Sequence, residues 1–267
     1  MSASTARTGA VIRKELAEFR RNRFIFVTAA ILPIVFLISP TVSILTLKAS
    51  VVSTVLDKHV ETALFLPLLI PVFVPALLSS YAVVGEREQG TLEPVLTTPV
   101  TRMELILGKA AAIFMPAVGL SYLVFGVFIA IVALFAKPAV ATEMWNAPQL
   151  PAEVVFIPLL AAWAIWVGLA VSSRVSDTRV AQQLSVLASV PAIALVALMS
   201  FRILTPSLWL ALALALALLA IDCGACFVVA GLFDRERLVT GARPTQRTAD
   251  PGTVRRLPPV TRLGGTT

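Results

Sequence analysis

The sequence predicts an all-α integral membrane protein with six transmembrane helices, an N-terminal interfacial helix, and a short cytoplasmic helix between spans two and three. Hydrophobic residues make up 58% and charged residues 14% of the 267 residues. The mean hydropathy is +0.89, which is typical of membrane proteins and not of soluble domains. Apolar stretches long enough to cross a bilayer, roughly 20 residues each, recur along the chain.

The predicted spans divide the chain into three parts. Residues 1–23 form an N-terminal segment, 24–233 the transmembrane domain, and 234–267 a basic tail whose Gly, Pro and Arg content predicts disorder. Uninterrupted apolarity favours helices over barrel strands, which would alternate between apolar and polar residues. The predicted spans are residues 24–47, 62–84, 110–136, 154–171, 181–201 and 207–233.

The distribution of basic residues predicts the orientation. With the N-terminus inside, all but four of the 22 Lys and Arg residues fall on the cytoplasmic side. The positive-inside rule therefore predicts that both termini are cytoplasmic. Basic residues at a membrane edge contact anionic lipid, so the net charge of +7 does not indicate nucleic-acid binding. The four residues left outside are Lys48, Lys58, Lys137 and Arg202.

Residues 10–22 have the spacing of an amphipathic interfacial helix, and we expect no cleaved signal peptide before them. Two roles remain open, namely a lipid-surface anchor or an anchor that also contacts a partner. The apolar side carries Val11, Ile12, Leu16 and Phe19, and the charged side carries Arg13, Lys14, Glu18 and Arg20.

The second span carries Pro67, Pro71 and Pro75, which are four residues apart and so share one stripe of a helix. Each proline frees a backbone carbonyl that neighbours or cavity water must satisfy. A bent helix beside a substrate path and simple packing against another helix both fit this pattern.

The one dense mixed-charge interlude in the middle of the chain, residues 85–109, follows the second span. Pro94 fits the first turn of a short helix that begins near residue 91, and Pro99 breaks the backbone again. Thr101 and Glu104 have capping-box spacing, which predicts that a new helix starts near Arg102. A hydrophilic segment held between two spans in this way is typical of a docking surface or a hinge.

This interlude resembles the cytoplasmic coupling loop of the ABC-2 type permeases, the membrane subunits of ATP-binding-cassette exporters. The resemblance is carried by the order Glu-x-Glu-x-Gly-Thr-Leu-Glu from residue 86, Thr-Pro at 98–99, Arg-x-Glu at 102–104 and Gly-Lys at 108–109. It implies that residues 1–23 contain an elbow helix and that the loop contacts a partner ATPase. The implied contact residues are Glu86, Glu88, Thr91, Leu92, Glu93, Leu96, Pro99, Arg102 and Glu104. Alternatively, the acidic residues cap helices and pair locally with Arg87, Arg102 or Lys109.

The second half of the chain contains one further candidate functional residue, Asp222. Prolines in the external segment 137–153 argue against a regular helix there, and residues 172–179 form a cytoplasmic turn. Asp222 lies inside the sixth span, where a carboxylate either lines a substrate path or pairs with another helix. Cys223 and Cys226 have no accompanying ligands and are expected to pack as small residues.

No ATP-binding or catalytic motif is present. Gly108-Lys109 lacks the preceding glycine and the following Ser or Thr of a phosphate-binding loop. We therefore expect a non-catalytic permease subunit with no cofactor or metal of its own, while ATP and Mg²⁺ belong to the partner. The resemblance implies an exporter in the plasma membrane, with two protomers, identical or paired with a sister permease, and two ATPase copies. The excess of Arg over Lys and the abundance of Ala indicate a bacterial source. Apolar spans with few polar residues favour a hydrophobic or amphipathic cargo such as a drug, lipid or natural product.

Two other classes remain open. An ion-coupled secondary transporter would use Asp222 as its coupling carboxylate, but it predicts inverted repeats and further intramembrane charges, and neither is found in the sequence. A non-transporting membrane scaffold would need no substrate path, and the docking-like loop is compatible with it.

Overall fold

The structure, a computed structural model, describes residues 3–21, 23–47, 53–90, 100–147, 149–200 and 208–232. All regular secondary structure in these segments is helical, as the apolar periodicity predicts. The helices are α1 (Ala3–Arg21), α2 (Arg23–Leu45), α3 (Ser53–Phe65), η1 (Pro67–Leu69), α4 (Ile70–Glu88), α6 (Arg102–Phe135), α7 (Pro138–Asn146), α8 (Gln149–Arg174), α9 (Thr178–Ala188), α10 (Val190–Ser200) and α11 (Leu208–Leu232).

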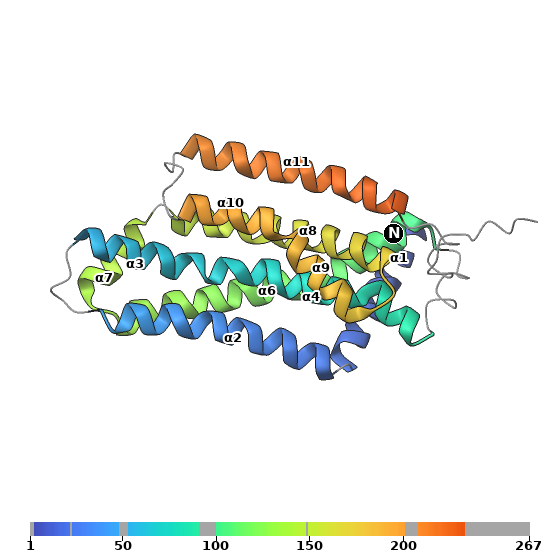
Figure 1. The fold of residues 1–267 in the computed structure, drawn as a ribbon, viewed down its shortest axis with the longest axis horizontal. Coiled ribbons are helices and arrows are strands. Elements are labelled where there is room, and N and C mark those ends of the chain that lie inside the picture. Colours follow the sequence, from blue (N-terminus) through green and yellow to red (C-terminus); the bar gives the residue numbers. More distant parts are fainter. Residues whose placement is uncertain are drawn as a thin grey trace, which may run out of the picture.

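The long helices lie side by side in one elongated bundle (Figure 1). In this view α11 runs along the upper edge and α2 along the lower edge, while α1 lies at one end of the bundle. The best-packed pair is α4 and α8, and α11 packs mainly on α8. Apolar side chains on α2 and α11, such as Ile34 and Phe227, remain exposed on the bundle's outer faces. Such faces suit contact with lipid, since lipid tails are as apolar as leucine.

Four helical stretches are long and apolar enough to cross a membrane by length and composition. They correspond to the second, third, fourth and sixth predicted spans, so four of the six expected crossings have support of this kind. The region of the first span contributes a shorter apolar helix, Ala30–Leu45. The four stretches are His59–Glu88, Arg102–Phe135, Leu150–Arg174 and Trp209–Leu232.

The fifth predicted span, residues 181–201, is not a single helix. It is divided between α9 and α10, and α9 ends in a turn at Ser189. The reason is Pro191, which lacks an N–H and would clash with the carbonyl four residues earlier in a continuous helix. At 11 residues each, neither helix reaches the roughly 20 residues of a straight crossing.

The external segment 137–153 is more helical than predicted. It contains α7, and α8 already begins at Gln149. The prediction was wrong because Pro138 and Pro151 occupy the first turns of these two helices. A first-turn proline costs no intrahelical hydrogen bond, since the N–H groups of that turn have no partner within the helix.

The predicted start of the third span is confirmed. Thr101 is the N-cap of α6, and its side chain accepts a hydrogen bond from the backbone N–H of Glu104. The Glu104 carboxylate accepts in return from the Thr101 N–H at 2.8 Å. This reciprocal pair satisfies two backbone donors and fixes where α6 begins after the charged interlude.

The centre of the bundle depends on one close approach between α4 and α8. A Cβ atom added at Gly168 would lie 1.7 Å from the Ser79 Oγ and 2.7 Å from the Ser79 Cβ. The Ser79 hydroxyl in turn donates to the Pro75 carbonyl at 2.7 Å, so this side chain is already held in place. Small residues therefore permit the two backbones to pack closely.

We expect Gly168→Ala to destabilise the protein by about 1–3 kcal/mol, because the new methyl group overpacks this contact. Unfolding in mixed micelles, followed by the loss of helical circular dichroism, measures the change. Gly126→Ala is the matched control, since nothing lies within 4 Å of a Cβ placed there. Equal effects of the two substitutions would contradict the role assigned to Gly168.

Candidate functional site

The amphipathic helix α1 lies against the first turns of α6, because a glycine on α6 leaves room for it. A Cβ atom at Gly108 would lie 2.6 Å from the Val11 Cγ1 atom. This absence of a side chain brings α1 close to the next residue of α6, Lys109. The predicted helix at residues 10–22 is therefore found, and it extends from Ala3 to Arg21.

Lys109 is fully buried, with 0% of its side chain exposed. Its ammonium lies 2.6 Å from the Glu15 Oε1 on α1 and 2.8 Å from the Glu86 Oε2 on α4. The ammonium also donates to the Ala82 carbonyl at 2.7 Å. An ammonium group has three N–H donors and no acceptor, and here it makes two hydrogen bonds, to Glu15 and Ala82, and an ion pair with Glu86.

A second lysine lies on the other side of these carboxylates. The Lys14 ammonium pairs with Glu86, lies 3.2 Å from Glu18 Oε1, and lies 3.5 Å from Glu15 Oε1. We refer to the five residues as the buried charge cluster, in which Lys109, Glu15 and Glu86 are buried and the Lys14 and Glu18 side chains are partly exposed at its edge. It joins α1, α4 and α6, and its members are Lys14, Glu15, Glu18, Glu86 and Lys109.

Burial and the neighbouring charges together determine the pKa values in the buried charge cluster. Burial raises the pKa of the Glu15 carboxyl, and the nearby Lys109 ammonium only partly offsets this effect. Burial alone would lower the pKa of Lys14, but the charges of Glu86, Glu15 and Glu18 outweigh it and raise that pKa above its ordinary value. Lys14 therefore stays charged, and the two ammonium groups hold the carboxylates together.

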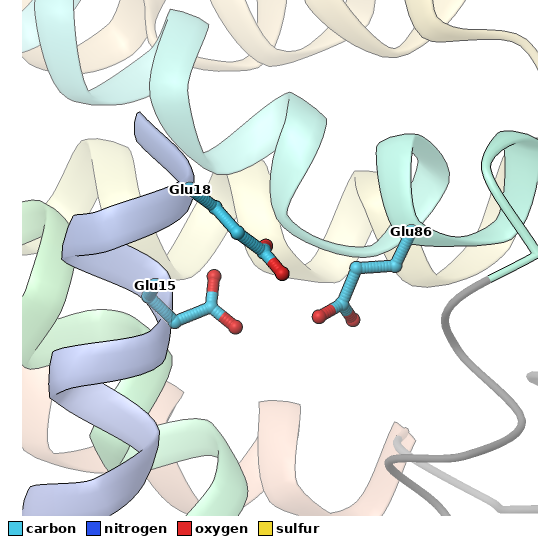
Figure 2. A group of neighbouring side chains, drawn as sticks. All are labelled: Glu15, Glu18 and Glu86. Atoms are coloured by element: carbon cyan, nitrogen blue, oxygen red, sulfur yellow. The ribbon is translucent and has the colours of Figure 1, made fainter. Parts of the chain in front are cut away.

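Figure 2 shows the three carboxylates of this cluster converging from α1 and α4. One oxygen from each of Glu15, Glu18 and Glu86 lies within 4.8 Å of the others, a spacing that a metal ion could use. The ammonium groups of Lys14 and Lys109 already lie among these oxygens. A lysine ammonium supplies the positive charge that a metal ion would bring, so the arrangement is that of an ion-pair cluster.

Three further contacts extend this junction. The Arg7 guanidinium donates to Glu104 Oε1 at 3.0 Å, which ties α1 to the capped start of α6. Arg87 near the end of α4 donates to the Val175 carbonyl at 2.9 Å. The Glu88 carboxylate accepts from the Thr178 N–H at 3.2 Å, at the start of α9. The ends of α4 and α6 that flank residues 91–99 are thus both anchored to neighbouring elements.

A serine links α8 to the same end of α4. The Ser172 Oγ accepts from the backbone N–H groups of Val83 and Val84, each at 3.2 Å, and donates to the Ser80 carbonyl at 2.8 Å. The predicted turn at 172–179 is shorter than expected, because α8 continues to Arg174 and α9 begins at Thr178. Whether it also contacts a partner stays a prediction.

The predicted coupling residues fall into three groups. Glu86 and Glu104 are buried, and Glu86 makes the local pairing with Lys109 that the sequence left open. Glu88 and Arg102 are exposed beside the segment. Contact of any of them with a partner stays a prediction. The remaining five lie outside the described residues: Thr91, Leu92, Glu93, Leu96 and Pro99.

The predicted residues of the interfacial helix fall into two groups, exposed residues and members of the buried charge cluster. Arg13 and Arg20 are exposed, whereas Lys14 and Glu18 join the cluster. Sequence reasoning did not identify Glu15, although its position four residues after Val11 places it on the buried side of α1. This four-residue spacing is the sequence feature that could have identified Glu15.

The candidate path residues are all buried within the chain. Pro67 begins η1, and Pro71 and Pro75 lie in α4, so the prolines interrupt the predicted second span between Phe65 and Ile70. Asp222 is 4% exposed on α11. Their lining of a substrate path stays a prediction.

Comparison with known proteins gives one informative match. The model of a family described as ABC-2 family transporter protein matches residues 9–208, about three-quarters of the chain. The match covers α1 from residue 9, the charged interlude and the helices from α2 to α10. No curated protein matches the chain.

We expect Lys109→Met to destabilise the protein by about 3–5 kcal/mol, because it leaves the buried carboxylates of Glu15 and Glu86 without their main counter-charge. Adding Glu86→Gln to this variant should recover part of the loss, since it removes one stranded charge. Thermal unfolding of the single and double variants measures both effects. Arg13→Met, at an exposed position of α1, is the control and should change stability by less than about 0.5 kcal/mol. A harmless Lys109→Met would contradict the importance of the cluster.

Proposed function

Because the chain belongs to the ABC-2 family of transporter membrane proteins, we propose that it is the permease subunit of an exporter for a hydrophobic or amphipathic molecule. As a member of this family it is a non-catalytic, multi-pass membrane subunit that works with ATPase subunits. The proposal adds the direction of transport and the type of cargo. Long apolar helices with few intramembrane polar groups support an apolar cargo over a small hydrophilic one.

The proposed assembly has two protomers and two ATPase copies, with ATP and Mg²⁺ bound by the ATPases. Each protomer crosses the membrane six times, and both termini face the cytoplasm. The region of the fifth crossing would combine α9 and α10 around the break at Ser189. The bacterial plasma membrane is the proposed location.

The observation that carries this proposal is the buried charge cluster beside residues 91–99. A partner that docks on these residues pulls or pushes on the end of α4 and the start of α6. Glu86 and Lys109 join these two helix ends to each other, and Glu15 joins them to α1. Moving one of the three helices alone would separate buried opposite charges, which is costly. The three therefore move as one body when the ATPases close, tilting the helices between inward-open and outward-open states.

This mechanism gives the acidic residues two separate roles. Glu93, which lies in the docking segment by sequence, would contribute to binding of the ATPase. Glu86, which is buried, would transmit motion without contacting the ATPase. Glu88 lies between the two, because it is exposed but also accepts from the start of α9.

We expect Glu93→Ala to weaken co-purification with the ATPase subunit encoded beside this chain. The double variant Glu86→Gln/Lys109→Met should retain co-purification but lower the ATPase rate of the assembled complex in proteoliposomes several-fold. Thr142→Ala on α7, at the opposite end of the bundle, should leave both properties unchanged. A chain that shows no association with the ATPase would overturn the proposed function. Loss of association in the double variant would assign the cluster to docking instead of transmission.

The proposed orientation is tested by labelling single cysteines in a Cys223→Ser/Cys226→Ser background. A cysteine replacing Trp145, which is exposed on α7, should react with a membrane-impermeant maleimide in intact cells. A cysteine replacing Arg13 on α1 should react only after lysis, because the positive-inside rule places this end in the cytoplasm. The opposite pattern would show an inverted topology.

A further inference from the structure

Asp222 is a buried carboxylate whose charge the described chain does not compensate. It is 4% exposed, and both of its carboxylate oxygens are buried without a hydrogen-bond partner among the described residues. By contrast, the carboxylates of Glu15, Glu86 and Glu104 all have lysine or arginine partners. A charged carboxylate held in an apolar interior without a partner costs several kcal/mol.

The sequence offers Asp222 no counter-charge at its depth. Residues 110–136, 154–173 and 203–233 contain no Lys, Arg or His, and the nearest basic residue along the chain is Arg235. That residue is 13 positions away along the chain. A second copy of this chain carries the same uncharged stretches and adds no cation there. The compensating positive group must therefore come from a proton or a bound ligand.

Asp222 points into the bundle and not toward lipid. It shares a helical face with Leu218 and Val229, which belong to the buried core, and with Ala225, which packs against that core. The neighbouring residue Cys223 lies on the exposed side of α11. A ligand held by Asp222 would therefore lie between α11 and the helix on which α11 packs, α8.

The helix on which α11 packs, α8, carries a second buried polar group, the indole of Trp163. The indole Nε1 of Trp163 is also buried without a hydrogen-bond partner among the described residues.

We propose that Asp222 forms the anionic subsite for the positively charged group of a membrane-soluble ligand, with Trp163 as its aromatic neighbour. The carboxylate supplies the Coulomb attraction, and an indole face attracts a cation through its quadrupole. The inference rests on the proposed function, in that it narrows the cargo to lipophilic cations.

The test uses the purified full chain in lipid nanodiscs and two probes of similar size and opposite charge. Equilibrium dialysis measures binding of tetraphenylphosphonium and tetraphenylborate, with empty discs subtracted to remove partitioning into lipid. Wild type should bind the phosphonium cation in preference to the borate anion. Asp222→Asn should weaken binding of the cation by about tenfold or more, whereas Asp222→Glu should retain most of it.

Further variants separate binding from structure. Trp163→Leu should weaken binding of the cation several-fold, whereas Trp145→Leu and Cys223→Ala, both at exposed positions, should not. Thermal unfolding gives an independent readout, because a carboxylate without a partner predicts that Asp222→Asn is neutral or stabilising. Marked destabilisation by Asp222→Asn would show a structural pairing and overturn the proposal.

Equal affinity of wild type and Asp222→Asn for tetraphenylphosphonium would also overturn it, as would no binding by the wild type. The measurement needs no ATPase, so a negative result leaves the permease assignment standing. Conversely, failure to associate with an ATPase would leave the binding result interpretable.

Discussion

The burial of the Lys109 ammonium is the constraint on which the rest of the structure depends. A fully buried ammonium needs three acceptors, and here they come from Glu15 on α1 and from Glu86 and Ala82 on α4. One side chain on α6 thus fixes the positions of two other helices. Gly108 makes this possible, because any larger residue would hold α1 away from the site.

This constraint links the two helices that flank the charged interlude to each other and to their neighbours. The helices before and after residues 91–99 cannot move independently, because Glu86 near the end of α4 and Lys109 near the start of α6 are directly paired. Further contacts from Arg87 to Val175 and from Glu88 to Thr178 add the α8–α9 turn. A force applied to the segment is therefore distributed over α1, α4, α6 and α8. Isolated surface ion pairs could not transmit it in this way, because water would compensate their separation.

The sequence predicted those features that local rules determine. The start of α6 followed from Thr101 and Glu104, which lie three residues apart and contact each other. Four helices long and apolar enough to cross a membrane followed from apolar length. The pairing of Lys109 with Glu15 could not be predicted in this way, because it joins residues 94 positions apart and requires α1 to fold back onto α6. The break at Ser189 was missed because apolarity alone does not separate one crossing from two short helices, although Pro191 carried the signal.

The carboxylates of the buried charge cluster and that of Asp222 are of two kinds, those that the chain itself neutralises and one that its described helices do not. The helix α8 packs against α4 and α11, which carry Glu86 and Asp222. At the junction of α1, α4 and α6, every buried carboxylate that pairs with Lys109 is compensated by the chain itself, so no ligand is needed to stabilise it. On α11, Asp222 has no such partner among the described helices, so its charge depends on what occupies the site. Because α11 packs on α8, and Ser172 of α8 bonds the backbone of α4 near Glu86, a continuous set of contacts runs between them. If the proposed ligand binds at Asp222, its occupancy and motion at the charge cluster would act on the same helix, which would satisfy the physical requirement for coupling that ligand to the ATPase.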